Sequence, residues 1–214
     1  MKIIERINEN KVHISFEVFP PKTDAGYESV KRAVDEIAVL KPSFISVTYG
    51  AGGGTSKNTV KIASHIKNEL GVPSIAHLTC MSSTKEEVRN VIEQMKVSGI
   101  ENILALRGDR PKDLETPLPN DYHYASELIR DIKEQGDFCI GAACYPEGHV
   151  ESPYKKDDIL HLKEKVDCGV DFLTTQMFFD NNILYNFLNR IREKGITVPV
   201  LPGIMPVTNK KQIT

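Results

Sequence analysis

The sequence predicts an α/β fold in which a parallel sheet curls into a (β/α)8 TIM barrel, as one domain over residues 1–214. Short apolar segments alternate with amphipathic ones along the whole chain, with a period of roughly 30 residues that is typical of βαβ units. Most of the apolar segments end in polar residues, and a barrel builds its active site from polar groups at many separate strand ends. A doubly wound open sheet is the competing architecture, but its site would gather at one switch point.

The first predicted strand carries Glu17 inside an apolar run that Pro20 and Pro21 end. Alternation of strands with helices requires a parallel sheet that helices cover. No GxGxxG motif follows the first strand, which also disfavours a dinucleotide-binding open sheet. The predicted strands are Val12–Phe19, Phe44–Tyr49, Ser74–Cys80, Asn102–Arg107, Cys139–Tyr145, Phe172–Phe178 and Pro199–Ile204.

The segments between the strands have helical periodicity, with apolar residues at three- and four-residue steps. Thr84 and Glu87 form a capping-box pattern at the start of one helix. The predicted helices are Tyr27–Leu40, Lys57–Leu70, Lys85–Ser98, Tyr122–Gln135, Asp157–Asp167 and Asn181–Lys194. Glycine at the end of a helix favours the left-handed conformation that closes a C-terminus. The glycines predicted in this role are Gly71, Gly99, Gly136, Gly169 and Gly195.

The predicted strands number seven, whereas a closed barrel has eight strands and about 250 residues. We expect the last strand and its helices to be missing from this sequence. The edges of strands one and seven would then be unpaired. Such a chain is expected to be less stable than a full barrel, or to close the gap by self-association.

Composition narrows the function classes. With 40% hydrophobic residues, 26% charged residues and a net charge of -2, the chain is an ordinary globular protein without the basic surface that nucleic-acid binding needs. No apolar run approaches the roughly 18 residues of a membrane span, and the charged N-terminus is unlike a signal peptide. The 4 cysteines have no CxxC or zinc-ligand spacing and no HExxH motif is present, so no metal site is expected. We expect a cytoplasmic protein with reduced cysteines.

Short motifs at the predicted strand ends resemble those of one known family. The motifs are SFEVFPPK (15–22), SVTYG (46–50), HLTC (77–80), ALRGD (105–109), YPEGH (145–149), TQMFFD (175–180) and PGIMPV (202–207). Each motif alone is weak, but their order along the chain resembles the catalytic domain of 5,10-methylenetetrahydrofolate reductase. The resemblance implies reduction of methylenetetrahydrofolate to methyltetrahydrofolate, in one-carbon metabolism. It implies FAD as hydride donor, re-reduced by NADH or NADPH in a ping-pong cycle through one shared site.

Glu17 is the first candidate catalytic residue. A strand-end carboxylate that pairs with a lysine or caps a loop would explain it without chemistry. However, Phe16, Val18 and Phe19 would desolvate the carboxyl and favour its protonated form. An acid poised near neutrality can protonate a leaving nitrogen. The resemblance implies this role, in which proton delivery opens the folate imidazolidine ring and the resulting iminium accepts hydride.

Arg107, Gly108 and Asp109 follow the fourth predicted strand. A surface turn with an ion pair is the simplest explanation, although Gly108 would let the backbone approach a ligand closely. The resemblance implies that all three contact FAD and that Asp109 also binds folate and tunes the flavin potential. Gln176 would need a hydrogen-bond partner in its apolar strand; the resemblance implies a contact to the pterin ring.

The remaining candidates rest on the resemblance, because each alone is typical of a core or surface residue. The implied FAD contacts are Thr48, His77, Tyr124, Ala125, His149, Asp158 and Lys165. Gln212 is an implied contact to folate or nicotinamide. The glycine-rich segment 50–55 could cradle phosphate, but it lacks the P-loop lysine and a plain βα loop is the simpler expectation.

Two other function classes remain open. One is a flavin-free pterin-binding barrel, such as a folate-dependent methyl carrier. The other is an incomplete barrel that serves as an interaction subunit. We expect the protein to be a homo-oligomer. The resemblance also implies that an electron-transfer partner protein could supply the electrons, as it does for some members of that family.

Overall fold

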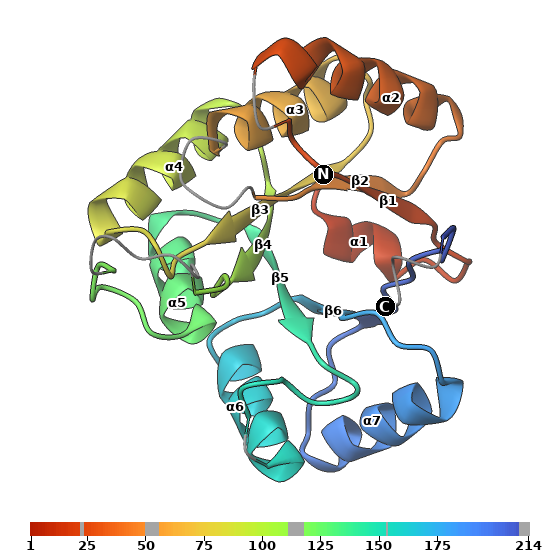
Figure 1. Ribbon diagram of the computed structural model, residues 1–214, viewed down its shortest axis with the longest axis vertical. Coiled ribbons are helices and arrows are strands. Elements are labelled where there is room, and N and C mark those ends of the chain that lie inside the picture. The colour runs from red at the N-terminus through yellow and green to blue at the C-terminus, as the bar shows by residue number, and fades with distance from the viewer. Residues whose placement is uncertain (22–23, 50–55, 111–117, 153, 210–214) are drawn as a thin grey trace.

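A computed structural model describes residues 1–21, 24–49, 56–110, 118–152 and 154–209. One sheet of seven parallel strands runs in chain order from β1 to β7. The sheet curls around a central axis and the helices cover its outer side (Figure 1). The strands are β1 Ser15–Val18, β2 Phe44–Val47, β3 Ser74–Thr79, β4 Asn102–Leu106, β5 Cys139–Cys144, β6 Phe172–Thr175 and β7 Val200–Leu201.

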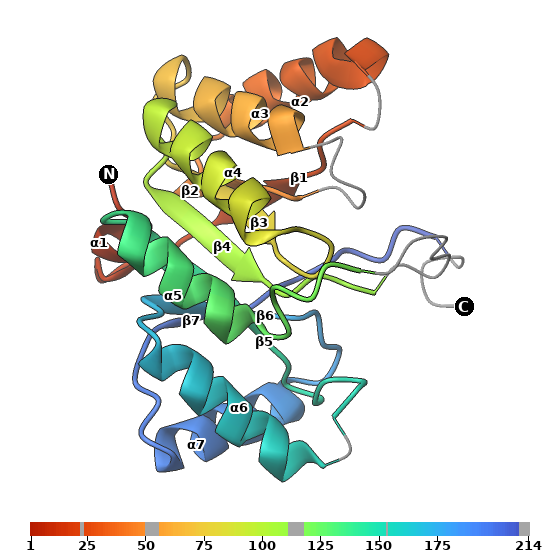
Figure 2. The ribbon, with the colours of Figure 1, turned by 90° about the vertical axis from the view of Figure 1, so that its left-hand side faces the viewer.

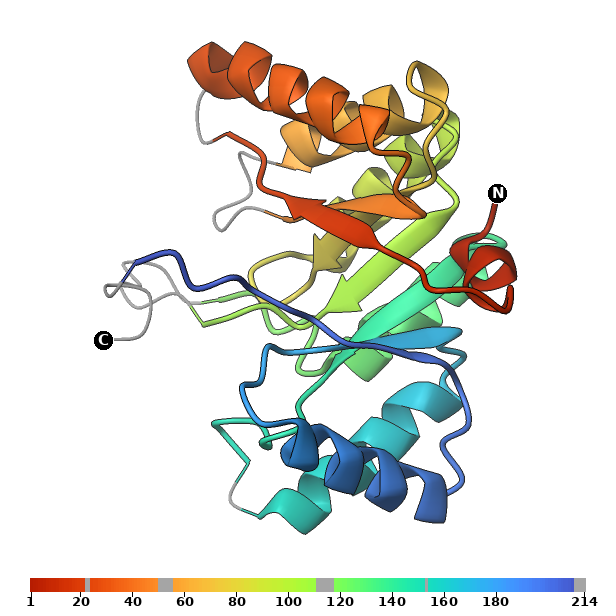
Figure 3. The ribbon, with the colours of Figure 1, turned by 90° about the vertical axis from the view of Figure 1, so that its right-hand side faces the viewer.

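This topology confirms the predicted TIM-barrel class and excludes the doubly wound alternative. A doubly wound sheet reverses its strand order at a switch point, whereas here each strand pairs with its sequence neighbours. All seven predicted strands are present, but they end earlier than predicted because the polar residues after them belong to loops. Among the described residues, β1 pairs only with β2 and β7 only with β6. Figure 3 shows the side of the molecule where these two ends of the sheet lie.

All six predicted helices are present within a few residues of their expected bounds. The helices are α1 Ile3–Ile7, α2 Tyr27–Val39, α3 Ser56–Asn68, α4 Lys85–Val97, α5 Ala125–Gln135, α6 Lys155–Asp167 and α7 Asn181–Glu193, with a 3-10 turn η1 at Asp24–Gly26. The capping box at α4 is confirmed, since Glu87 N–H donates to Thr84 Oγ1 at 3.2 Å and Thr84 N–H donates to Glu87 Oε2 at 2.8 Å.

The glycine prediction holds at four of its five positions. Gly71, Gly99, Gly169 and Gly195 have φ values of 68°, 74°, 108° and 73°. It is wrong at Gly136, whose φ of 171° is extended backbone. At that position the chain leaves α5 and runs directly toward β5, so no left-handed turn is needed.

The sheet separates two apolar cores. The larger core lies between the outer face of the sheet and the helices. The smaller core fills the inside of the curl, and its buried members are Ile3, Phe44, Ile75, Leu104, Cys139 and Phe172. Gly141 belongs to this inner face, because a Cβ there would stand 2.5 Å from Cζ of Phe172.

Helix α1, which the sequence analysis did not predict, closes the amino-terminal end of the curled sheet (Figure 2). Ile3 N–H donates to Oδ1 of buried Asn102 at 2.8 Å, and Asn102 Nδ2 donates to the Ser74 carbonyl at 3.0 Å. Ile3 itself is fully buried among the inward side chains. With this end filled, the carboxyl ends of the strands form the accessible rim (Figure 2).

Candidate active site

Strand register brings three polar side chains to the inner face near the carboxyl ends of β1, β2 and β3. Glu17 is the register partner of Ser46. Successive side chains of a strand alternate between the two faces of the sheet. Ser46 therefore shares the face of Phe44, and His77 shares the face of Ile75, both of which belong to the inner core. Residues from three separate strands thus converge at one place.

These three side chains meet at one carboxylate oxygen. Ser46 Oγ donates to Glu17 Oε2 at 3.3 Å, and His77 Nε2 lies 3.5 Å from the same oxygen. The Glu17 side chain is 48% exposed while that of His77 is 6% exposed. Glu17 can therefore reach a ligand at the rim, whereas the imidazole lies beneath it.

Burial shifts the two titratable groups of this cluster in the directions that favour their neutral forms. Desolvation raises the pKa of Glu17, and the hydrogen bond from Ser46 partly opposes the rise. Desolvation lowers the pKa of His77 to about 4, so the imidazole is neutral at pH 7. Within the described part of the chain, Nε2 of His77 is buried and has no hydrogen-bond partner.

A second cluster joins the end of β4 to the loop after β5. The Arg107 guanidinium makes a bidentate ion pair with Glu151, at 2.7 and 2.8 Å. His149 Nδ1 accepts from the Glu151 N–H at 3.1 Å, and its ring packs edge-on against Tyr145 with centroids 4.7 Å apart. The ion pair raises the pKa of Arg107. Asp109 is exposed two residues after Arg107.

Gly108 adopts a left-handed conformation with φ of +85°, and a Cβ at this position would lie 3.1 Å from Cβ of Thr79. The close approach that the sequence suggested is therefore made to the end of β3. It turns the chain sharply after Arg107, whose carbonyl accepts from Met81 N–H at 2.8 Å.

Lys165 of α6 reaches under the rim. Its ammonium donates to the Ala143 carbonyl at 2.7 Å, and burial lowers the pKa of this lysine. Asp158, on the same helix, is near enough to oppose that shift. A lysine with one carbonyl partner keeps two N–H donors for another acceptor.

The other predicted residues in the described part of the chain lie at strand ends or helix starts. Thr48 follows β2, Tyr124 is the exposed N-cap of α5, and Ala125 is the first residue of that helix. Gln176 follows β6 with an exposed side chain. Gln212 and the glycine-rich segment 50–55 lie outside the described residues.

Three polar residues in the two clusters were not selected from the sequence. Ser46 stands in the apolar strand Phe44–Val47 just as Glu17 stands in its own strand, and this signal could have found it. Tyr145 stands in the YPEGH motif but was not singled out from it. Glu151 had no signal, because its contact depends on how the loop after β5 folds back toward Arg107.

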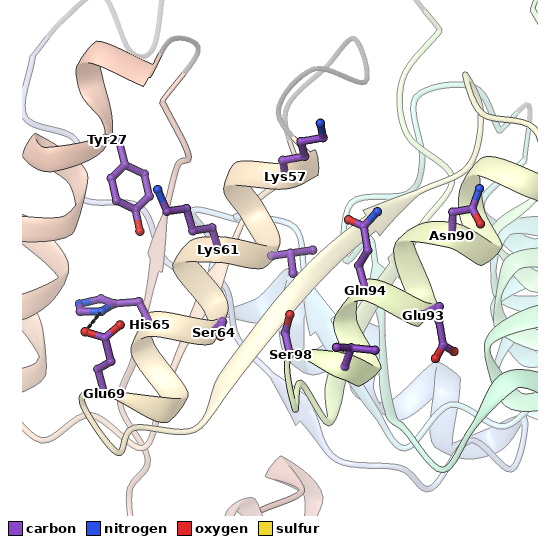
Figure 4. A pocket seen from close by; sticks show the side chains of 12 residues that line it. Tyr27, Lys57, Lys61, Ser64, His65, Glu69, Asn90, Glu93, Gln94 and Ser98 are labelled. Atoms are coloured by element: carbon purple, nitrogen blue, oxygen red, sulfur yellow. Dashed lines mark ion pairs between the residues drawn. The ribbon is translucent and has the colours of Figure 1, made fainter.

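A groove with a different lining lies on the outer helices. It has a volume of about 770 Å³ and is lined by Tyr27 and by residues of α3 and α4 on the outer helical layer (Figure 4). None of the predicted site residues lines it. Within the groove, Lys61 lies 3.8 Å over the ring of Tyr27 and His65 pairs with Glu69 at 3.0 Å.

The described part of the chain contains no cluster of three or more His, Cys, Asp or Glu side chains able to hold a metal ion. The four cysteines are free, and burial raises the pKa of the Cys80 and Cys144 thiols to about 12. No helix in the described ranges has the length and apolar character that a membrane crossing requires.

Comparison with solved structures supports the fold. A Clostridium thermocellum protein, described as binding two copies of 5-methyl-5,6,7,8-tetrahydrofolic acid, matches with a TM-score of 0.68 and 17% identity over 98% of this chain and 71% of that one. A 2,3-dimethylmalate lyase matches with a TM-score of 0.65 and 14% identity over 97% of this chain and 74% of that one. At these identities the likeness concerns the fold alone.

Sequence comparison gives the family. The family model described as methylenetetrahydrofolate reductase matches residues 2–214. The 5,10-methylenetetrahydrofolate reductases of Pectobacterium carotovorum and Escherichia coli are each 40% identical, over 96% and 95% of this chain and 67% and 68% of their own lengths. Methylenetetrahydrofolate reductase (NADH) 1 of Zea mays is 38% identical over 98% of this chain but only 38% of its own length. The chain therefore belongs to the methylenetetrahydrofolate reductase family.

Proposed function

We propose that this chain forms the catalytic barrel of an FAD-dependent methylenetetrahydrofolate reductase. The proposed reaction reduces 5,10-methylenetetrahydrofolate to 5-methyltetrahydrofolate, and NADH or NADPH serves as the electron donor. The observation that carries the proposal is the position of Glu17. Its carboxyl has a raised pKa, is half-exposed and lies at the carboxyl-end rim of the sheet, where enzymes of this fold place their chemistry.

Glu17 is the proposed general acid. Desolvation raises the pKa of the Glu17 carboxyl, which favours the protonated form that can give its proton to a nitrogen of the folate. Protonation of that nitrogen opens the five-membered ring and creates an electrophilic carbon. Neutral His77 beneath Glu17 adds no positive charge that would stabilise the carboxylate and lower the pKa of the acid.

The described residues have the chemistry that FAD requires. When bound, the flavin would supply the hydride. Arg107 and Lys165 offer N–H donors suited to a pyrophosphate, and the buried Nε2 of His77 has no hydrogen-bond partner among the described residues. Proposed contacts from Thr48, Gly108, Tyr124, Ala125, His149 and Asp158 would complete the cofactor site.

The proposed folate site uses further polar groups of the rim. Asp109 and Gln176 are exposed just beyond β4 and β6, so carboxylate and amide groups are available to the polar edge of a pterin. An exposed carboxylate at position 109 would also oppose the negative charge of a reduced flavin. Gln212 is proposed to contact folate or nicotinamide.

The test separates the two half-reactions in anaerobic stopped-flow measurements on the flavin-loaded protein. Glu17→Gln should leave flavin reduction by the nicotinamide intact, while oxidation of the reduced flavin by methylenetetrahydrofolate slows by about 10²-fold or more. Glu93→Gln, which removes an exposed carboxylate on the outer face of α4, is the matched control and should change neither rate.

Equal loss of both half-reactions in Glu17→Gln would refute the assignment of the general acid. A full-length preparation without bound flavin, seen as no absorbance at about 450 nm, would favour a flavin-free pterin-binding barrel instead. Retained folate reduction in Glu17→Gln would likewise overturn the proposed mechanism.

A further inference from the structure

We propose that Ser46 is the positioning residue of Glu17: its hydroxyl anchors Oε2 of the carboxyl group, so that Oε1 carries the proton delivered to the substrate. The inference rests on the proposed function, because it gives a role to the neighbour of the proposed general acid. Among the described residues, Ser46 Oγ and His77 Nε2 are the polar side-chain atoms that approach the carboxyl group, and both lie at Oε2.

The chemistry of β2 makes the Ser46 hydroxyl unusual. The strand is otherwise Phe, Ile and Val, and Ser46 is only 8% exposed. A buried hydroxyl costs free energy unless it is hydrogen-bonded, whereas alanine would fill the same space without that cost. The Glu17 carboxyl group is the partner that Ser46 has in the structure, and the strand register places the two residues side by side.

The groups around Glu17 indicate that the Ser46 hydroxyl is the donor of a hydrogen bond to its carboxyl group. Ser46 on β2 and His77 on β3 both face the Glu17 carboxyl group. His77 Nε2 lies 3.5 Å from Oε2 but makes no hydrogen bond to a described residue. Burial keeps the imidazole neutral at pH 7. Helix α2 packs against the outer face of β1, away from the inward carboxyl. Among the described residues, no lysine or arginine side chain forms an ion pair with Glu17 within 4.0 Å.

The contact has a measurable consequence for protonation. A hydrogen bond to the ionised carboxylate stabilises that form and lowers its pKa. The bond length of 3.3 Å is long for an O–H donor, so the effect should be modest. Removing the hydroxyl should raise the pKa of Glu17 by about 0.5 to 1 unit.

The test is a carbon-13 NMR titration of the glutamate side-chain carboxyl carbons in the purified chain, with Glu17→Gln identifying the Glu17 resonance. Ser46→Ala should raise the pKa of Glu17, and Ser46→Thr should return it toward the wild-type value because a hydroxyl is restored. The matched control is Ser74→Ala. Ser74 is also a buried strand serine, but its Oγ has no hydrogen-bond partner among the described residues, so this variant should leave the Glu17 pKa unchanged.

A second measurement uses the flavin-loaded protein. In Ser46→Ala, the pH above which folate reduction declines should move upward by the same amount, while flavin reduction by the nicotinamide keeps its pH profile. An unchanged Glu17 pKa in Ser46→Ala, or an equal shift in Ser74→Ala, overturns the inference. Neither outcome bears on the proposed function, which the half-reactions of Glu17→Gln test separately.

Discussion

Buried His77 should make the stability of this protein depend on pH in a way that one substitution removes. Its side chain is 6% exposed, and desolvation lowers its pKa from the ordinary value of 6.5 to about 4. Between these two pH values the unfolded chain binds one more proton at this position than the folded chain. The free energy of unfolding must therefore rise with pH across this window.

The magnitude follows from the two pKa values. The contribution of the neutral imidazole is fully present above pH 6.5 and is lost as the pH falls through about 4. The slope is about 1.4 kcal/mol per pH unit, and the total is about 3 kcal/mol. Glu17 works in the opposite direction, because its raised pKa favours folding at low pH, so the comparison must isolate His77.

The assay is urea unfolding of wild type and His77→Gln at closely spaced pH values from 4 to 7.5, with Glu17→Gln as a common background for both. Glutamine keeps a polar group near the position of Nε2 but does not titrate. The unfolding free energy of the protein with His77, relative to that of the protein with His77→Gln, both in the Glu17→Gln background, should rise by about 3 kcal/mol over the window. A difference that stays constant with pH would show that the imidazole is not desolvated as the structure has it.

Two further predictions concern the scaffold that supports the rim. Gly141→Ala should lower the free energy of unfolding by about 1 to 3 kcal/mol, because a Cβ at this position would stand 2.5 Å from Cζ of Phe172. In a Phe172→Leu background this loss should be smaller. An equal loss in both backgrounds would contradict the packing argument. Thr84→Ala should cost about 1 kcal/mol in urea unfolding because it removes the α4 capping box. Thr84→Ser should keep most of that stability, so equal losses in the two variants would contradict the cap.

Much of the fold could be predicted because local patterns and backbone chemistry agree along the chain. The period of apolar residues located all seven strands and six of the helices, and the Thr84 cap fixed the start of α4. Helix α1 was missed because its five residues are too few for a periodic signal. Its position depends instead on the hydrogen bond to Asn102, which is distant in sequence.

The candidate site was predicted less completely for a related reason. Glu17 could be identified because a carboxylate in an apolar strand is unusual. The pairing of Arg107 with Glu151 could not be anticipated, because the two residues are 44 positions apart and meet only when the loop after β5 folds back. No local sequence pattern predicts a contact between residues that are so far apart in the chain.

The amino-acid sequence by itself determined the alternation of strands and helices, the parallel sheet and the likeness to a reductase family, since these depend on short-range periodicity and on motifs. The tertiary structure alone decided which oxygen of Glu17 accepts the hydrogen bond from Ser46, that His77 is buried beneath Glu17, and that a groove lies between helices of the outer layer. Strand register and sheet curvature set those distances and that burial, and both result from packing the whole chain around two cores.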